Sequence, residues 1–261
     1  MNIVVCLKQV PGTTEVKIDP VKNTLIRQGI KSIVNPFDAY ALEEGVRLKE
    51  RYTGKVTAIS MGPPQAVDML RDAISTGADE AVILSDIAFA GADTWATAYT
   101  LGKAVRKINN FDLVICGRQT IDGDTGQVGP ELAEMLGIPF IAYVSKVEEI
   151  TDRKIRVQRM AEDGYETIET TLPAVITVVK EINIPRLPSF RGMTKAKTAQ
   201  VPTWKAEDIG AEKENVGLAG SATQVVKIFF PKIVQTAEML KGDAETQINS
   251  LVAKLKEAKL I

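Results

Sequence analysis

Short apolar runs alternate with amphipathic stretches over the first half of this chain, and this alternation constrains the fold more than any other feature. Such runs are typical of strands covered on both faces in a parallel sheet. Strand, helix and parallel strand following in that order predict an α/β fold with right-handed crossovers and a doubly wound, mostly parallel sheet. The predicted strands lie at 3–7, 55–60, 81–84 and 112–116. The predicted helices lie at 38–52, from the residue after the loop 61–64 to about Thr76, and at 93–108.

The second half of the chain has a different texture. Closely spaced β-prone segments at 140–179 predict antiparallel edge strands. The segment 184–197 combines two prolines with apolar and basic residues, which is typical of an exposed loop that contacts a partner. Periodicity then stays weak until an amphipathic helix at 244–260. We therefore expect an α/β domain over 1–200 and a C-terminal arm over 201–261.

Two local expectations concern the N-terminal region. The β-prone pieces within 16–26 predict a small hairpin. The helix at 38–52 has apolar residues at roughly helical spacing, so its charged residues are expected on the opposite, solvent-facing side. The residues expected to face solvent are Glu43, Glu44, Arg47 and Lys49.

The chain contains no histidine, which removes Ser-His and Cys-His nucleophile activation and the commonest transition-metal ligand. Cys6 and Cys116 lie in apolar runs and are expected to be inert core thiols. A net charge of −1 without a basic cluster argues against nucleic-acid binding. No apolar run is long enough for a membrane span, and the N-terminus lacks a signal-peptide pattern. We expect a cytoplasmic protein without catalytic side chains or a metal site.

Residues 117–130 form the strongest local motif, because they leave a predicted strand and enter a helix. Glycines at 117, 123, 126 and 129 let the backbone approach a ligand, Thr125 and Gln127 offer neutral donors, and the helix N-terminus presents unpaired N–H groups to phosphate. The motif is neither a Walker A loop nor a Gly-x-Gly-x-x-Gly turn. The alternatives are a connector that only allows close packing, or a divalent-cation site at Asp122 and Asp124. The sequence favours a phosphate cradle.

Two further loops are expected at the same edge of the sheet. Residues 35–38 precede a predicted helix, and residues 89–97 form a small-residue loop with hydroxyls at Thr94 and Thr97. Simple helix capping is the alternative for both. Because ligands bind doubly wound sheets at the carboxyl ends of the strands, we expect the three loops to define one pocket.

Four motifs, in this order and at this spacing, resemble those of the β subunit of electron transfer flavoprotein over about the whole chain. They are residues 5–11, 35–38 with 42–44, 117–130 and 185–197. The resemblance implies a Rossmann-like heterodimer partner of a larger α subunit that carries the electron-transferring FAD. It also implies a second adenine nucleotide in this chain. That nucleotide is AMP in ordinary members, and in electron-bifurcating members it is FAD that accepts a hydride from NADH.

Residues 88–97 resemble the stretch that borders the isoalloxazine in bifurcating members, which favours FAD over AMP. The resemblance implies that Cys6, Met61 and the loops 35–38 and 117–129 hold the adenosine and phosphates, with the start of the 93–108 helix near the flavin. The implied cofactor-binding residues are Cys6, Asn35, Pro36, Phe37, Asp38, Met61, Asp93, Thr94, Thr97, Gly117, Arg118, Gln119, Ile121, Asp122, Gly123, Asp124, Thr125, Gly126, Gln127, Val128 and Gly129.

The segment 184–197 resembles the recognition loop that docks an acyl-CoA or hydroxy-acid dehydrogenase. Here residues 189–193 read SFRGM, whereas other members have Asn-Ile-Met in this region, so the dehydrogenase is not specified. The implied partner contacts are Leu187, Pro188, Phe190, Arg191 and Met193. Electrons from NADH would pass to ferredoxin or flavodoxin and, through the α-subunit FAD, to the dehydrogenase. The alternatives are an AMP-bearing electron carrier, a nucleotide sensor or ATP-using enzyme, and a loop that only ties the arm to the core.

Overall fold

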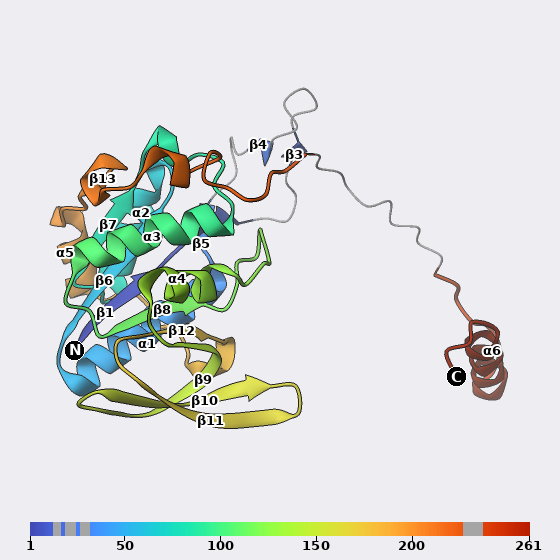
Figure 1. The fold of residues 1–261 in the computed structure, drawn as a ribbon. Helices are drawn as coiled ribbons and strands as arrows, with labels where there is room; N and C mark the ends of the chain where they lie inside the picture. Colours follow the sequence, from blue (N-terminus) through green and yellow to red (C-terminus); the bar gives the residue numbers. More distant parts are fainter. Residues whose placement is uncertain (13–16, 19–24, 27–31, 227–236) are drawn as a thin grey trace. The chain divides into compact units, whose positions relative to one another are not determined.

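The computed structural model describes residues 1–12, 17–18, 25–26, 32–226 and 237–261. The chain divides into two compact units, Met1–Val226 and Lys227–Ile261. The first unit is built on a nine-stranded sheet with helices on both faces (Figure 1). The α/β fold expected from the sequence is confirmed.

The sheet has the strand order β11-β10-β9-β12-β8-β1-β6-β7-β13. Pairings from β9 through β12, β8, β1, β6 and β7 to β13 are parallel, and β9, β10 and β11 pair antiparallel. The chain builds outward from β1 through β6 and β7, then returns to β8 on the other side of β1. Doubly wound sheets bind ligands outside the carboxyl ends of the strands at such a switch point, and we call this edge of the sheet the β1–β8 crevice. The bounds are β1 Asn2–Cys6, β6 Lys55–Met61, β7 Glu80–Leu84, β8 Leu113–Gly117, β9 Phe140–Thr151, β10 Lys154–Ala161, β11 Gly164–Thr171, β12 Ala174–Val178 and β13 Thr203–Trp204.

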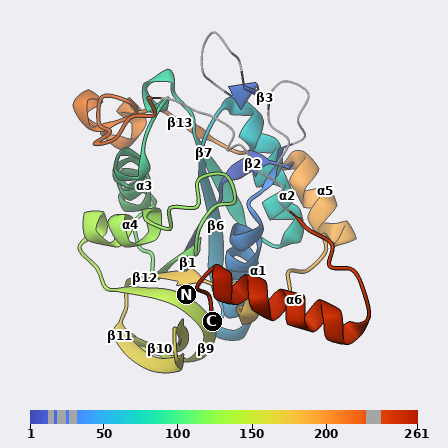
Figure 2. The ribbon, with the colours of Figure 1, turned by 90° about the vertical axis from the view of Figure 1, so that its right-hand side faces the viewer.

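The helices cover the sheet in two layers, with α1, α2 and α5 on one face and α3 and α4 on the other (Figure 2). Alternate side chains of β1 fill two separate cores, since Ile3 and Val5 point to the first layer and Val4 and Cys6 to the second. The bounds are α1 Pro36–Tyr52, α2 Val67–Thr76, α3 Thr94–Ile108, α4 Val128–Leu136 and α5 Phe190–Thr198, with 3-10 turns at Pro64–Ala66, Ile87–Phe89, Lys180–Ile182, Glu207–Ile209 and Lys213–Asn215.

Two short antiparallel pairs lie outside the main sheet. β2 (Gln9–Pro11) pairs with β5 (Ser32–Val34), which the sequence did not predict. β3 (Lys17–Ile18) pairs with β4 (Leu25–Ile26), which confirms that the two predicted strands of the hairpin pair with each other. The rest of that hairpin lies outside the described residues.

Three sequence predictions need correction. β12 is not an edge strand, because it pairs in parallel with both β8 and β9 inside the sheet. The segment predicted as a loop over 184–197 ends in helix α5, whose N-cap Ser189 accepts a bond from the Gly192 N–H at 3.0 Å. The weakly periodic region after residue 201 contributes β13, which extends the sheet beyond β7. Each departure depends on contacts with distant parts of the chain.

The solvent-facing side predicted for the helix at 38–52 is also wrong in part. Glu43 and Glu44 are buried, at 7% and 5% exposure. A buried carboxylate needs hydrogen-bond partners, and Glu43 and Glu44 find theirs on the segment that follows β12. Lys49 is largely buried as well and donates to Asp79 Oδ2 at 3.0 Å.

The second unit contains helix α6 (Ala244–Glu257), which confirms the predicted amphipathic helix. Asp243 caps it by accepting a bond from the Thr246 N–H at 2.9 Å. Its apolar residues Ile248, Leu251 and Val252 are exposed within this chain. Within the described parts of the chain, none of the helices has the length and apolar character that a membrane crossing needs.

Candidate functional site

The buried Asn35 side chain joins two predicted motifs at the crevice between β1 and β8. Its Nδ2 donates to the Gln119 carbonyl oxygen and to Asp38 Oδ1, both at 2.9 Å, and its Oδ1 accepts from the Ile121 N–H at 3.2 Å. It makes no capping bond to α1. The side chain therefore ties the turn 35–38 to the 117–130 loop, and the capping alternative for Asn35 is excluded.

The Asp38 carboxylate also holds the turn 35–38 in place. One carboxylate oxygen accepts from the Lys8 N–H at 2.7 Å, and the Gly117 N–H also donates to the carboxylate. Burial raises the pKa of Asp38 to about 7, although the bonds from Asn35, Lys8 and Gly117 act in the opposite direction. A Cβ on Gly117 would lie 2.4 Å from Asp38 Oδ1 and 2.7 Å from the Phe37 carbonyl carbon, so only glycine fits there.

The four glycines of the loop have different roles. A Cβ on Gly129 would lie 2.4 Å from Thr177 Cγ2, so Gly129 allows α4 to pack on β12. Gly117 and Gly129 thus match the close-packing alternative. Gly123 has only ordinary contacts at 3.4 Å or more, and Gly126 has a φ of +66° that turns the chain. These two leave the outer backbone of the loop open to a ligand.

The outer part of the loop is exposed while its carboxylates are engaged within the protein. Residues 121–125 and Gln127 are exposed. Asp122 accepts from Lys8 Nζ at 2.7 Å, and Asp124 accepts a short bond from the Gln119 amide. Burial would raise the pKa of Asp122, but the bond and the charge of Lys8 hold it below the usual value. The exposed backbone N–H groups of the loop and those at the start of α4 are therefore the donors that could bind an anion.

Arg118 supplies a cation at this edge. Its Nε donates to Gln119 Oε1 at 2.6 Å, and the guanidinium lies between the rings of Phe37 and Tyr143, 5.6 and 5.5 Å from their centroids. Tyr143 comes from β9 and was not found by sequence reasoning. The backbone of Tyr143 has an unusual φ of +59°, but this conformation is visible only in the structure and not in the sequence.

The start of α3 lies beside α4. Asp93 caps α3 by accepting from the Ala96 N–H at 3.0 Å, as the capping alternative predicts, and its other oxygen accepts from Thr223. Thr94 donates to Glu131 Oε1 at 3.1 Å. Among the residues that the structure describes, the second oxygen of Glu131 is buried and has no hydrogen-bond partner. The sequence did not single out Glu131 or Thr223.

The other predicted cofactor residues occupy the same edge. Met61 ends β6 and is half-buried against the α3–α4 core, and Thr97 is half-buried in the first turn of α3. Cys6 and Cys116 are free and buried, as predicted. A hydrogen bond with Cys116 and burial raise the pKa of the Cys6 thiol, which keeps it unreactive.

The predicted partner contacts lie on a different part of the surface. All five are exposed, and Leu187 and Phe190 reach 87% and 88% exposure. A hollow of about 200 Å³ lies beside this segment, between α1 and α2, and not at the crevice. The hollow is lined mainly by apolar side chains, whereas the backbone donors of the 117–130 loop and the Arg118 cation lie at the β1–β8 edge.

Residues 22–209 match the family model described as the electron transfer flavoprotein domain. The chain is 50% identical over 262 residues, all of both chains, to the electron transfer flavoprotein subunit beta of Thermoanaerobacterium thermosaccharolyticum. It is 49% identical over 257 residues, 98% of each chain, to the subunit of the same name from Clostridium acetobutylicum. It is also 49% identical over 263 residues, all of both chains, to the caffeyl-CoA reductase-Etf complex subunit CarD of Acetobacterium woodii.

Proposed function

This chain belongs to the electron transfer flavoprotein family as a β subunit, and we propose that it holds FAD at the β1–β8 crevice within a heterodimer. The observation that carries the proposal is the Asn35 bridge, which brings the turn 35–38 and the 117–130 loop into one cradle. Its exposed backbone donors, the start of α4 and the Arg118 cation suit a pyrophosphate. Asp122 and Asp124 are compatible with that anion because Lys8 and Gln119 engage them.

The unpartnered oxygen of Glu131 favours FAD over AMP. AMP needs only the adenosine and phosphate part of the cradle, whereas FAD extends further along the sheet edge. Glu131 Oε2 is buried beside Thr94, at the start of α3, and an acceptor there calls for a donor from a bound group. The hydroxyl-bearing chain of FAD has such donors.

The chemistry of the bound flavin would be to accept a hydride from NADH. The protein's own residues would bind and orient it, since the chain offers no histidine for proton transfer. We propose that electrons then pass to ferredoxin or flavodoxin and, through the α-subunit FAD, to an acyl-CoA or hydroxy-acid dehydrogenase. The name of the Acetobacterium relative, which belongs to a caffeyl-CoA reductase complex, supports the acyl-CoA class.

We further propose that the exposed residues of 184–197 contact this dehydrogenase and that the C-terminal arm contacts the α subunit. The support is the exposure of Leu187 and Phe190 on the segment, and of Ile248 and Leu251 on α6. The first compact unit runs to Val226, beyond the boundary at residue 200 expected from the sequence, so the arm that we propose as the α-subunit contact is the second unit with helix α6.

Anaerobic titration of the co-purified heterodimer with NADH tests this function. We expect NADH to bleach the flavin absorbance rapidly. An AMP-bearing carrier, the alternative, would receive electrons from its dehydrogenase and would keep its flavin absorbance when NADH alone is added. That second result would contradict NADH as the donor.

A further inference from the structure

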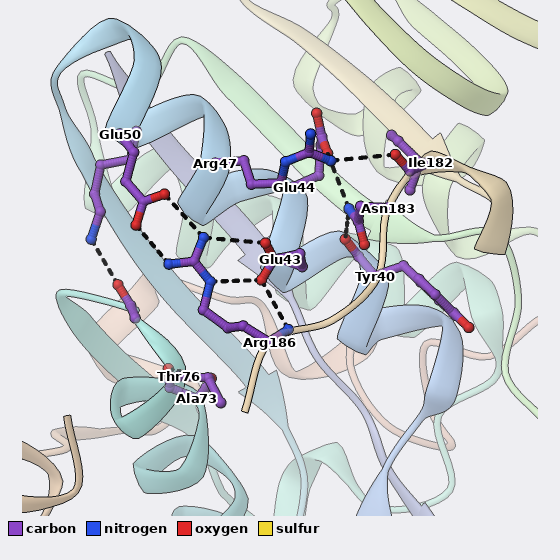
Figure 3. A network of polar contacts seen from close by, with 12 residues as sticks. Tyr40, Glu43, Glu44, Arg47, Glu50, Ala73, Thr76, Ile182, Asn183 and Arg186 are labelled. Carbon is purple, nitrogen blue, oxygen red and sulfur yellow. Dashed lines mark hydrogen bonds and ion pairs between the residues drawn. The ribbon is translucent and has the colours of Figure 1, made fainter. Parts of the chain in front are cut away.

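A cluster of ion pairs holds the start of the 184–197 segment on helix α1 (Figure 3). Arg186 donates from Nε to Glu43 Oε2 at 2.8 Å and from Nη2 to Glu43 Oε1 at 3.2 Å. It also donates from Nη1 and Nη2 to the two oxygens of Glu50, at 2.6 and 3.0 Å. Such forked pairs fix orientation as well as distance. We call Arg186, Glu43 and Glu50 the Arg186 clamp.

The two halves of the Arg186 clamp differ in burial. The Glu43 side chain is 7% exposed, whereas that of Glu50 is 54% exposed. The hydrogen bond from Arg186 lowers the pKa of Glu50, and bonds to Glu50 and Glu43 raise that of Arg186. The inner pair is shielded from solvent, so loss of the Arg186 guanidinium would remove the salt-bridge partner that the described residues give to the buried Glu43 carboxylate.

Asn183 forms a second tie between the same part of the chain and helix α1. Asn183 Nδ2 donates to Glu44 Oε2 at 3.0 Å and to the Tyr40 carbonyl oxygen at 3.1 Å. Further along the segment, a Cβ on Gly192 would lie 2.0 Å from the Ser75 carbonyl oxygen, so the backbone of α5 touches α2 directly. Leu187 and Phe190 therefore lie between a contact on α1 and a contact on α2.

Apolar packing does not explain how the α1 end is held. The hollow of about 200 Å³ lies directly under this end and is lined by Leu42, Met69, Ala73 and Pro185, among others. Side chains that border an open hollow lose the contacts that would otherwise fix them. The Arg186 clamp and Asn183 are thus the main restraints there.

Helix α1 also carries the nucleotide cradle. Asn35 and Asp38 lie at its N-terminus, and Glu43 follows five residues after Asp38, about 7.5 Å along the helix axis. On the premise of the proposed function, we propose that Arg186 is a positioning residue that presents Leu187 and Phe190 to the dehydrogenase in one arrangement, fixed relative to the cradle. Such pre-organisation lowers the ordering cost of docking.

The test measures how wild-type and Arg186→Gln heterodimers react with one dehydrogenase from the same organism. This dehydrogenase, of either proposed class, is one that the wild-type complex reduces. We expect KM for the dehydrogenase to rise roughly ten-fold while kcat changes less than about two-fold. NADH-driven reduction of a soluble dye should not change. Amide hydrogen exchange over 183–189 should accelerate by at least about ten-fold, because opening of the segment is no longer opposed.

A double variant separates positioning from stability. Glu43→Gln/Arg186→Gln removes the unpaired buried charge, so its unfolding midpoint should return toward the wild-type value while KM stays raised. Arg156→Gln is the matched control, since Arg156 bonds Glu148 and Glu149 at 3.2 and 2.9 Å on the β9–β10 pair. It should leave KM unchanged.

Serine variants of Leu187 and Phe190 distinguish this inference from the function on which it rests. If they leave KM unchanged, docking by this segment is refuted, and the positioning role with it. If they raise KM but Arg186→Gln alters neither KM nor amide exchange, docking holds and the positioning role alone is overturned.

Discussion

Replacing Gly117 by alanine should dismantle the cradle. The added Cβ would lie 2.4 Å from Asp38 Oδ1 and 2.7 Å from a backbone carbon of Phe37. Neither clash is relieved by rotating a side chain end, because Asp38 is held by three hydrogen bonds and Phe37 contributes backbone. The turn 35–38 must therefore move away from the loop.

The size of the effect follows from that movement. Reaching an ordinary contact of 3.4 Å requires a shift of about 1 Å at Asp38, which would stretch its 2.7 Å bond from the Lys8 N–H beyond hydrogen-bonding distance. The lost bond to a carboxylate costs about 1.5–3 kcal/mol. The overpacking adds about 1–3 kcal/mol. We expect the free energy of unfolding to fall by roughly 3–5 kcal/mol, with loss of the bound nucleotide.

Gly123→Ala in the same loop is the control. Gly123 has no positive φ, and a Cβ there has its nearest neighbour, Thr120 Oγ1, at 3.4 Å. Its effect on stability should stay within about 0.5 kcal/mol. Both heterodimers would be compared by chemical denaturation and by the FAD retained after gel filtration. If Gly117→Ala retains wild-type stability and FAD, the close approach of the turn and the loop is not what forms the site.

The remaining predictions concern Asn35, the titration of Asp38 and the exposed face of helix α6. Asn35→Ala removes three hydrogen bonds and should lower the free energy of unfolding by about 3 kcal/mol and release FAD; an unchanged melting temperature would show that Asn35 does not join the motifs. Because the folded-state pKa of Asp38 is raised to about 7, the folded state binds this proton more tightly than the unfolded state. The contribution of Asp38 to the free energy of unfolding is therefore complete below about pH 4 and is lost as pH rises through 7. Unfolding experiments should show a fall of at most about 1.4 kcal/mol per pH unit in that window, which Asp38→Asn should flatten. Leu251→Glu on α6 should weaken α-subunit binding measured by analytical ultracentrifugation, whereas glutamate at the exposed Tyr165 of β11 should not; equal affinities would rule out α6 as the contact.

Patterns within a few residues were enough to predict the central sheet. The apolar runs of β1, β6, β7 and β8 are buried on both faces, so burial and sequence pattern agree along each strand. The loops 35–38 and 117–130 were predicted to share an edge because parallel strands end together. The Asn35 bridge itself was not predicted, since its partners in the 117–130 loop, Gln119 and Ile121, lie more than 80 residues away.

Features that depend on distant partners were missed. Glu43 and Glu44 fit a solvent-facing pattern, but Arg186 and Asn183, about 140 residues away, make their burial tolerable. Helix α5 has a glycine in its first turns and weak intrinsic preference for helix, and it is stabilised by packing on α2. A two-residue strand such as β13 has no sequence period to detect.

The most direct test of the account is to purify the heterodimer, release its cofactors by denaturation, and count FAD and AMP. We expect two FAD and no AMP per heterodimer, because the cradle and the Glu131 region together suit the longer cofactor. One FAD and one AMP would contradict it, and would make this chain the structural subunit of an electron carrier.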